Sequence, residues 1–572
     1  MFDKAARSTG HDVIIVGSGA GGSMAAYALT RAGINVLVLE AGRSYDPQAE
    51  VNMLGQEHEA PLRATGTVDK PFGYYDATID GGWQVPGEPY TTAKDEKFEW
   101  WRSRMLGGRT NHWGRHVPRF GPYDFKPFSR DGIGMDWPVS YDEVAPWYDR
   151  TEEIVGLWGA RNGLENHPDS PPGIAHPVPK PRVYELLIKA AANDLGVPCV
   201  PSRYAILTKD KPDEVAPRNA CYYTSPCGRG CSIGAAFQAT TSLLPLAAAT
   251  GRLTVVTDAM VAKVVMKSKN KADGVEYVDR KTGQRHTVTA KAVILAASAC
   301  ETSRLMLNSR NDDHRNGVAN GSGQVGRNLV DTVGGYTGGI IPGLEGRPIY
   351  NEEGADQAHL YIPWWLYKEQ KEGKLNFARG YHFEIGGGFR LPGPWTGGGD
   401  LPRANGAELR AAMKRRMGNR VHFSLRGEMI PNKDCYAEID ANVRDKWGIP
   451  VLKFHWKWSD QEINMVQHGL DTARAIIKRM GGTVTNPNDT GETNIRPGGF
   501  IIHEGGTARM GADPKTSVLD AYNRCWEVPN LLVTDGAMLT SNPHKNPTLT
   551  IMALAWRACD KLAADIKQGA FA

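Results

Sequence analysis

Cysteine is scarce in this sequence, with 8 residues in 572. Cys199, Cys300, Cys435, Cys525 and Cys559 lie far apart without framework spacing, which argues against a disulfide-stapled secreted fold. Long apolar runs are also missing, because no stretch reaches eighteen apolar residues and GSGAGG interrupts the first apolar segment. The sequence therefore predicts neither a membrane span nor a signal peptide.

An excess of one charge is missing as well, since 67 lysines and arginines nearly balance 63 aspartates and glutamates. The one basic cluster, ELRAAMKRRMGNR at 408–420, is interpreted as a solvated helix face. No long basic tract carries interleaved aromatic residues, so nucleic acid is not an expected partner. With 41% hydrophobic residues, the chain is long enough for a large core and two or more structural domains.

The strongest local pattern follows His11 and reads DVIIVGSGAGGSMAAYALTRAGINVLVLEAG. An apolar strand, a glycine turn, an amphipathic helix and a second apolar strand predict a dinucleotide-binding βαβ unit rather than a merely structural glycine turn. Gly17 permits the tight turn, Gly19 lets backbone N–H groups approach a pyrophosphate, and Gly22 allows the helix to pack on the strand. Glu40 ends the second strand, where it is placed to accept the ribose hydroxyls.

The remaining patterns predict a second kind of sheet. Residues 41–142 are rich in Gly, Pro and Trp and predict ordered loops that cover a site. KAVILAASACETSRLMLNS at 291–309 predicts another strand and helix of the nucleotide domain. Alternating strands over 333–456 predict an antiparallel sheet, and the apolar spacing over 459–481 predicts a helix packed on it. The expected fold class is α/β, or α+β overall, with a Rossmann-like domain and a discontinuous antiparallel-sheet domain.

Three segments carry candidate chemistry. In MLGGRTNHWGR, Gly107 and Gly108 would bring backbone close to a ligand, and His112 follows. His503 is expected to follow an apolar strand in GGFIIHEGGTARMG and to project into a cavity. In the last segment, Asp535 and Gly536 follow a strand, as expected for contacts to a ribityl or pyrophosphate group, and Pro547 starts a helix with Asn546 as its N-cap.

Cys221, Cys227 and Cys231 lie within eleven residues of one another in NACYYTSPCGRGCSIGAAFQ. Three thiols this close are compatible with a soft-metal site, with a redox pair plus a spare thiol, or with packing. The spacing alone leaves these alternatives open.

GSGAGG with Glu40, LGGRTNHWG, ILAASACETSRLML, HEGGTARMG and NPTLT occur in this order over nearly the whole chain. Together they resemble the glucose-methanol-choline (GMC) flavoprotein oxidoreductases. The resemblance implies an FAD-binding domain over residues 1–330, with lid loops at about 41–142 and the cysteine segment at about 218–235. It also implies a substrate-binding sheet domain over 331–485, and a return to the FAD domain over 486–572.

By position, the resemblance implies that His503 is the catalytic base and Asn546 its partner, 43 residues later. A neutral imidazole can take a hydroxyl proton, and an amide NH₂ can hold the same oxygen. His544 is assigned to pocket lining. The cofactor contacts implied elsewhere are Asn111, His112, Asn546, Pro547 and Thr548. His112 stands where some relatives carry a covalent flavin link and others bind FAD dissociably, which the sequence leaves open.

The cysteine segment resembles that of bacterial flavin sugar dehydrogenases, which implies a three-iron, four-sulfur cluster on Cys221, Cys227 and Cys231. The expected enzyme is a dehydrogenase, closest to glucoside 3-dehydrogenases, that oxidises glucosides or disaccharides and passes electrons to a cytochrome c-type acceptor. A small subunit with a twin-arginine signal would carry it to the periplasm, with a cytoplasmic location as the alternative. A pyranose oxidase-like enzyme that makes hydrogen peroxide and a non-catalytic dinucleotide-binding protein with structural zinc are the other hypotheses.

Overall fold

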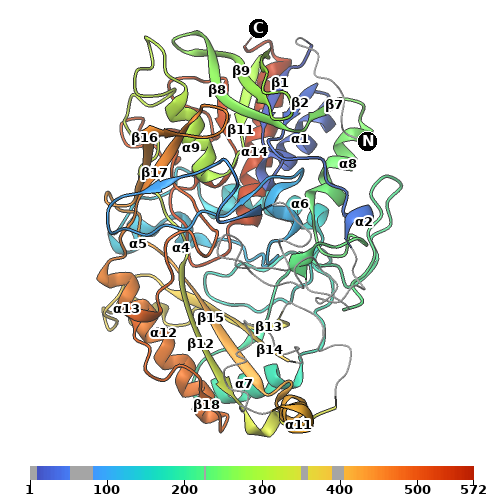
Figure 1. Ribbon diagram of the computed structural model, residues 1–572, viewed down its shortest axis with the longest axis vertical. Helices are drawn as coiled ribbons and strands as arrows, with labels where there is room; N and C mark the ends of the chain where they lie inside the picture. The colour runs from blue at the N-terminus through green and yellow to red at the C-terminus, as the bar shows by residue number, and fades with distance from the viewer. Residues whose placement is uncertain (1–9, 52–80, 224–226, 349–357, 389–404, 572) are drawn as a thin grey trace.

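A five-stranded parallel sheet with the order β19-β11-β1-β2-β7 forms one end of the molecule in the computed structural model (Figure 1). Its strands are β1 (Val13–Val16), β2 (Val36–Leu39), β7 (Leu253–Val256), β11 (Ala292–Leu295) and β19 (Leu531–Val533). β1, β2, β11 and β19 are buried at every position, as expected for a parallel sheet covered on both faces. The expected Rossmann-like sheet and the α/β class are confirmed.

The structure describes residues 10–51, 81–223, 227–348, 358–388 and 405–571. Part of the expected lid loops, 52–80, and residues 224–226 of the cysteine segment lie outside the described residues.

Three helices pack on one another beside the parallel sheet, with α1 (Ala20–Arg31) in contact with β1 and β2. This helix also contacts α14 (Thr548–Lys567), which in turn packs on α6 (Tyr141–Val155). The rings of Tyr27 and Trp556 meet edge to face, with centroids 5.4 Å apart, in the contact between α1 and α14. α8 (Leu243–Ala249) also packs on α1, and α9 (Ala299–Asn308) follows β11 as the sequence predicts.

A six-stranded sheet with the order β18-β12-β15-β14-β13-β6 forms the other end of the molecule. Its strands are β6 (Val200–Pro201), β12 (Val333–Ile340), β13 (Leu360–Ile362), β14 (Tyr381–Gly387), β15 (Arg420–Gly427) and β18 (Thr483–Val484), all paired antiparallel. The predicted helix is α12 (Asp460–Arg479), which contacts β12 and β15. Gly339 of β12 lets α12 approach, because a Cβ there would lie 2.6 Å from the Ile477 side chain.

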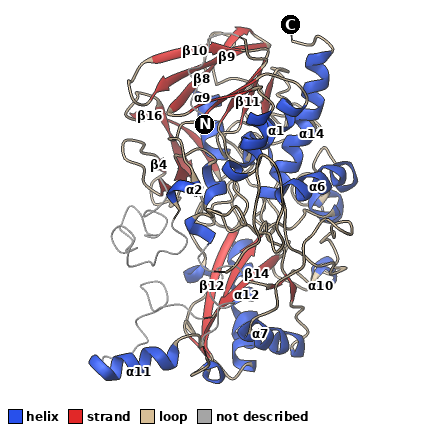
Figure 2. Ribbon diagram, turned by 90° about the vertical axis from the view of Figure 1, so that its right-hand side faces the viewer, coloured by secondary structure: helices blue, strands red, loops and turns tan. Residues whose placement is uncertain are grey.

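Three smaller sheets complete the fold of the described residues, and β8 (Ala259–Ser268), β9 (Lys271–Asp279) and β10 (Arg285–Thr289) lie at the same end of the molecule as the parallel sheet (Figure 2). These three strands form one antiparallel sheet, and β3 (Gly81–Gly82) pairs with β5 (Arg102–Ser103). β16 (Tyr436–Arg444) pairs with β17 (Pro450–His455), which pairs with β4 (Thr91–Thr92), and both β16 and β17 contact α9. These two strands fall inside the 331–485 range but lie beside the nucleotide-type domain rather than in the six-stranded sheet.

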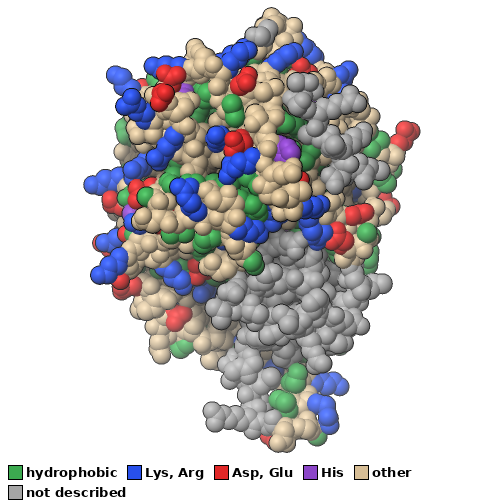
Figure 3. Space-filling view, turned by 45° about the horizontal axis from the view of Figure 1, so that its top comes forward, with side chains coloured by type: hydrophobic (Ala, Val, Ile, Leu, Met, Phe, Trp, Pro, Cys, Tyr) green, Lys and Arg blue, Asp and Glu red, His purple; other side chains and the backbone are tan. Residues whose placement is uncertain are grey.

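The short helices are α2 (Pro47–Glu50), α4 (Pro122–Phe125), α5 (Pro127–Asp131), α7 (Val183–Asp194), α10 (Tyr367–Lys371), α11 (Gly406–Arg416) and α13 (Gly491–Asn494). α11 carries the basic cluster and buries Ala412 as its one buried residue, as a solvated helix face should. On the face in Figure 3, basic and acidic side chains are interspersed. Within the described residues, no helix combines the length and the apolar character that crossing a bilayer requires.

Candidate active site

A cavity of about 810 Å³ lies where the carboxyl ends of the parallel strands face the six-stranded sheet. The predicted site residues that line it are Gly17, Gly19, Glu40, Gly108, His112, His503, Asp535, Gly536, Asn546, Pro547 and Thr548. Gly22, Gly107 and Asn111 were also predicted to contact the cofactor, but they do not line it. The chain thus brings the glycine turn, the histidine segment and the C-terminal segment to one space.

The glycine turn between β1 and α1 has the shape a phosphate group requires. Gly17 has a left-handed φ of +97°, a conformation that favours glycine. A Cβ on Gly19 would meet nothing within 4 Å, so the space beside its backbone is open to a ligand. Gly21 and Gly22 instead face protein, because a Cβ on them would overlap the carbonyl groups of Thr534 and Gly17.

Glu40 holds the glycine turn as well as lining the cavity. Its Oε2 accepts hydrogen bonds from the backbone N–H of Ser18 at 3.0 Å and from the Ser18 hydroxyl at 2.5 Å, and its Oε1 accepts from the Gly42 N–H at 2.7 Å. A carboxylate has about four acceptor positions. Acceptor capacity therefore remains for a ribose hydroxyl group.

The loop after β5 lies directly on this turn. The Gly107 N–H donates to the Ser18 hydroxyl at 2.9 Å, and a Cβ on Gly108 would lie 3.4 Å from the Gly19 Cα. The side chain of Asn111 is fully buried and donates to the Leu106 carbonyl at 2.9 Å. Asn111 therefore shapes the loop and does not reach the cavity.

His112 is the next residue of this loop and lines the cavity. It is 7% exposed, and its ring meets the Trp101 ring edge to face at 5.9 Å. Burial, together with the charges of Arg109 and Arg115, lowers the pKa of His112 to about 3. Its imidazole is therefore neutral at pH 7.

His503 is held by two segments of the chain. Its backbone N–H donates to the Asp331 carboxylate at 2.9 Å, and its backbone carbonyl accepts from the Asn542 side chain at 3.0 Å. Its ring Nδ1 lies 3.0 Å from the Thr332 hydroxyl. Burial and the nearby Arg426 guanidinium lower the pKa of His503 to about 3. The ring is thus neutral at pH 7, and its Nδ1 edge is occupied by Thr332.

The expected strand before His503 is wrong. Residues 499–501 form a turn, in which the Phe500 N–H donates to the Pro497 carbonyl at 3.2 Å and the Ile502 N–H to the Gly499 carbonyl at 3.1 Å. Gly499 has a φ of +79°, which a regular strand does not adopt. The apolar run resembles a strand in sequence, but the glycines and Pro497 fold it into a turn.

Asn546 is fixed at both ends of its amide group. Its Nδ2 donates to Glu384 at 3.0 Å, and its Oδ1 lies 2.9 Å from His116 Nδ1. Because a carboxylate only accepts, this arrangement assigns the amide orientation and places a proton on Nδ1 of His116. The expectation that Asn546 is a helix N-cap is wrong, since α14 begins at Thr548 and Pro547 occupies the cap position.

Asp535 caps the short helix of residues Gly536–Met538. Its carboxylate accepts from the Ser298 N–H at 3.0 Å, the Thr302 hydroxyl at 2.5 Å and the Ala537 N–H at 2.8 Å. Burial raises the pKa of Asp535 to about 6. The side chain thus joins the end of β19 to the start of α9 at the cavity wall.

The sequence analysis missed the polar wall opposite the glycine turn. Glu384 of β14 and Arg426 of β15 line the cavity and form an ion pair at 3.1 Å. Burial alone would raise the pKa of Glu384, but Arg426 and the adjacent His382 lower it well below its usual value. His382 and Glu384 lie two residues apart on one face of β14, and Arg426 of β15 lies opposite His382. Polar residues at alternate positions of the predicted strands were the available signal.

His116, His382 and Glu384 have the donor types of a metal site. Among the described residues, they are the one group of three His, Cys, Asp or Glu ligand atoms within 4.8 Å of one another. Glu384 Oε1 already accepts from Asn546 while its Oε2 pairs with Arg426. Positive charge therefore already neutralises the carboxylate, so we interpret the group as a hydrogen-bonding network that orients Asn546.

Cys221, Cys227 and Cys231 come together in a small apolar cluster outside the main core. The Tyr223 N–H donates to the Cys221 sulfur at 3.4 Å, and the Ala236 N–H to the Cys231 sulfur at 3.5 Å. Arg115 connects this cluster to the cavity loop, because it donates to the carbonyls of Cys227 at 2.8 Å and Asn111 at 3.0 Å. The cysteine segment is thus one side chain away from the loop that lines the cavity.

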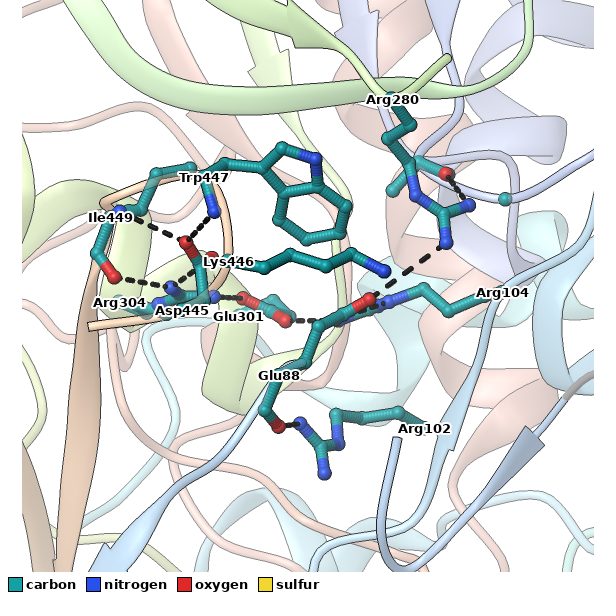
Figure 4. A network of polar contacts seen from close by, with 12 residues as sticks. Glu88, Arg102, Arg104, Arg280, Glu301, Arg304, Asp445, Lys446, Trp447 and Ile449 are labelled. Carbon is teal, nitrogen blue, oxygen red and sulfur yellow. Dashed lines mark hydrogen bonds and ion pairs between the residues drawn. The ribbon is translucent and has the colours of Figure 1, made fainter. Parts of the chain in front are cut away.

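Acidic and basic side chains alternate in a network of polar contacts (Figure 4), of which Arg104, Glu301 and Arg304 line the cavity. Arg104 lies 2.5 Å from both Glu88 and Glu301, and Arg304 lies 2.8 Å from Asp445 and 3.4 Å from Glu301. These contacts tie the loop around β5 and the turn between β16 and β17 to α9. The network thereby fixes the positions of these elements beside the cavity.

Comparisons with family models, with related sequences and with solved structures agree with one another. Family models described as GMC oxidoreductase match residues 12–333 and 431–555. 2-Methyl-1,2-propanediol dehydrogenase of Mycolicibacterium austroafricanum is 31% identical over 558 residues, covering 96% of this chain and 95% of that protein. The fructose dehydrogenase large subunit of Gluconobacter japonicus is 28% identical over 567 residues and 98% of each chain. Pyridoxine 4-oxidase from Mesorbium loti shares the fold, with a TM-score of 0.62, 16% identity, and coverage of 96% of this chain and 99% of that chain.

Proposed function

Because the chain belongs to the GMC oxidoreductase family, we propose that it is an FAD-dependent dehydrogenase that oxidises a secondary hydroxyl group of a sugar to a ketone. The observation that carries this proposal is the placement of His503 and Asn546 on one cavity with the glycine turn of the nucleotide-type fold.

The residues present fit FAD. The open space at Gly19, the twelve-residue helix α1 behind it and the acceptor Glu40 suit a pyrophosphate and a ribose. When bound, FAD supplies the acceptor for the hydride that leaves the carbinol carbon. Acid precipitation tests whether FAD is linked to His112, because a covalently bound flavin stays with the precipitated protein.

His503 is the proposed base. With its proton on Nδ1 and donated to Thr332, the neutral ring has Nε2 available to accept the hydroxyl proton of the alcohol. Asn546 is the proposed orienting group. Glu384 occupies one of its N–H groups, and the second can donate to the same hydroxyl oxygen and fix the direction of the C–H bond.

The proposed substrate is a glucoside or disaccharide oxidised at C3. The support is the combination of LGGRTNHWGR, the cysteine spacing and HEGGTARMG in the sequence, together with a cavity wall that carries the Glu384–Arg426 pair. Charged groups of this kind form strong hydrogen bonds to sugar hydroxyls.

The proposed exit for electrons is an iron–sulfur cluster, with three irons and four sulfides, on Cys221, Cys227 and Cys231. Oxidation of one secondary alcohol to a ketone releases two electrons and two protons, and two molecules of a cytochrome c-type acceptor would each take one electron. Two of the sulfur atoms, those of Cys221 and Cys231, accept hydrogen bonds from backbone N–H groups. These bonds support the proposal, since they stabilise cluster thiolates. Among the described residues, the three cysteine sulfurs do not form a group in which all atoms lie within 4.8 Å of one another. Thiolates bound to one zinc ion lie about 4 Å apart, so this spacing favours a cluster over a single zinc ion.

Anaerobically purified protein tests the proposal. We expect near-stoichiometric FAD, about three irons per chain, bleaching of the flavin by glucosides, cytochrome c reduction and a 3-keto sugar product. Zinc without iron or flavin would favour the binding-protein hypothesis. Turnover with oxygen, formation of hydrogen peroxide and no iron would favour the oxidase.

We further propose that a small subunit with a twin-arginine signal exports the folded chain to the periplasm, as the kinship with a fructose dehydrogenase large subunit suggests. Fractionation of cells that express both subunits tests this: the chain should appear in the periplasm with its partner and stay in the cytoplasm without it.

A further inference from the structure

Ile502, the residue before His503, has a left-handed backbone with a φ of +66°. A β-branched side chain disfavours this region strongly. Such a conformation persists only where the surroundings hold it, and it gathers at functional sites. Because Ile502 directs the chain into His503, whatever holds its backbone also sets the position of the imidazole.

Two contacts hold the Ile502 backbone: its N–H donates to the nearby Gly499 carbonyl at 3.1 Å, and its carbonyl accepts from the distant Arg109. The Nη1 of Arg109 donates to the Ile502 carbonyl at 3.0 Å and to Glu504 Oε2 at 2.6 Å, and its Nη2 donates to Glu504 Oε1 at 3.3 Å. The guanidinium thus contacts the residues on both sides of His503. Glu504 is nearly buried, with its side chain 2% exposed, so the ion pair lies in a region of weak solvent screening.

Arg109 is itself fixed to the glycine turn. It follows Gly107 and Gly108, which contact Ser18 and Gly19. We infer that Arg109 is a positioning residue that keeps Ile502 left-handed and thereby orients His503 relative to the dinucleotide turn. The inference rests on the proposed role of His503 as the base.

Arg109 also lines the cavity, so a purely electrostatic effect on a bound ligand must be distinguished from positioning. Arg109→Lys separates the two effects. The lysine keeps the positive charge and can pair with Glu504, but it lacks the planar fork that reaches Glu504 and the Ile502 carbonyl together. Ile502→Gly is the matching change, because glycine adopts a left-handed backbone without strain.

The experiment measures the effect of Arg109→Lys in two backgrounds, with FAD-loaded protein and a dye acceptor. In the Ile502 background, we expect kcat to fall about tenfold with KM within about twofold. In the Ile502→Gly background, the same change should cost less than about threefold. Equal losses in both backgrounds would overturn the inference, because Arg109 would then act independently of Ile502.

A second measurement does not depend on activity. The backbone N–H of His503 donates to the Asp331 carboxylate. The hydrogen-exchange rate of this amide reports how firmly the turn is held. Exchange should be faster in Arg109→Lys than in the wild type, and the difference should shrink in the Ile502→Gly background. Unchanged exchange would also overturn the inference.

Two variants serve as controls. Arg474→Lys changes another guanidinium that joins backbone carbonyls, those of Asn486 and Asp489, to a carboxylate, that of Asp471, and kcat should not change. His503→Ala tests the premise: if it keeps full kcat, the proposed base is wrong whatever Arg109 does. If His503→Ala abolishes turnover while the two backgrounds respond equally, the positioning inference alone is wrong.

Discussion

Asn546 donates its side-chain N–H to Glu384 over 3.0 Å, which joins the proposed orienting amide to a strand of the opposite sheet. Glu384 is in turn paired with Arg426. The carboxylate therefore decides which edge of the Asn546 amide faces His116 and which hydrogen atom remains for the cavity. The two ends of the molecule share one hydrogen-bonded group at the site.

Glu384→Gln should lower kcat/KM. A glutamine can present its own NH₂ to Asn546, so the amide orientation is no longer fixed, and Arg426 loses its counter-charge. Misplacement of a reacting group costs roughly tenfold to a hundredfold. Steady-state kinetics at equal flavin content measure the effect. Glu372→Gln removes an exposed partner of Lys374 and should change nothing. An unaltered kcat/KM in Glu384→Gln would show that Asn546 is oriented by other groups.

Gly19→Ala should lower the flavin content of the protein, whereas Gly21→Ala should lower its stability. A Cβ on Gly19 meets no protein atom within 4 Å, whereas one on Gly21 overlaps the Thr534 carbonyl. Gly19→Ala should therefore fold normally and contain less flavin, because the methyl group would occupy the space that we propose for the pyrophosphate. Gly21→Ala should unfold at lower denaturant concentration. Flavin absorbance and urea midpoints measure the two effects, and full flavin content in folded Gly19→Ala would contradict the cofactor placement.

The glycine turn could be predicted because all its determinants are local. Strand, turn, helix and acid occupy Val13 to Glu40 in continuous sequence, and each has a distinct pattern. The segment at 498–502 shows the limit of such patterns. Its apolar residues match a strand, but Gly499 and Ile502 are left-handed, and the Ile502 carbonyl accepts a hydrogen bond from Arg109, almost 400 residues earlier in the chain.

The polar wall could not be assembled from sequence for the same reason. His116, Glu384, Arg426 and Asn546 come from four segments, and strand pairing alone places His382 opposite Arg426. Asn111 shows the converse. It lies in a motif predicted to bind cofactor, but its side-chain amide donates to the Leu106 carbonyl and accepts from the Thr240 hydroxyl. The direction of a side chain depends on tertiary contacts that a motif does not contain.

Cys231→Ser should remove the proposed cluster and spare the flavin. Cys231 is buried in the cysteine segment and accepts from the Ala236 N–H. We expect iron to be lost, sugar to reduce the flavin as before, and cytochrome c reduction to fall by about tenfold or more. Cys525→Ser, in the main core, is the control and should keep its iron. Retention of iron in Cys231→Ser would exclude this cysteine as a ligand.

The protein should lose stability below neutral pH. Burial lowers the pKa of ten histidines, His11, His112, His116, His167, His176, His359, His382, His468, His503 and His544. Their unfolded pKa is about 6.5, so the stability they contribute is complete above that pH. It is lost as the pH falls toward their folded values, by at most about 1.4 kcal/mol per pH unit for each histidine.

Four buried carboxyls oppose this trend, because burial raises the pKa of Asp331 and Glu428 to about 7, that of Asp535 to about 6, and that of Glu185 above its usual value. The histidines outnumber them, so the guanidinium chloride midpoint should fall between pH 7.5 and pH 5.5. His286→Gln, at an exposed position, should show the same decrease. A constant midpoint over this range would contradict the expectation that these histidines are neutral in the folded protein.

Arg104→Met should destabilise the protein more than any exposed ion pair does. Arg104 contacts both Glu88 and Glu301 at 2.5 Å, and all three side chains are at most 10% exposed. Its removal leaves two buried carboxylates whose remaining cations are farther away, Arg280 at 3.9 Å from Glu88 and Arg304 at 3.4 Å from Glu301. Such a change costs about 3–5 kcal/mol. Flavin content should fall too, because Arg104 and Glu301 line the cavity.

The matched control is Arg479→Met, which breaks a pair with Asp194 whose side chains are 56% and 50% exposed. Solvent screens such a pair, so the loss should stay below about 1 kcal/mol. A triple change of Arg104→Met with Glu88→Gln and Glu301→Gln should recover part of the loss, because it removes the uncompensated charges. Equal destabilisation by the single and triple changes would show that Arg104 stabilises the fold by packing rather than by charge.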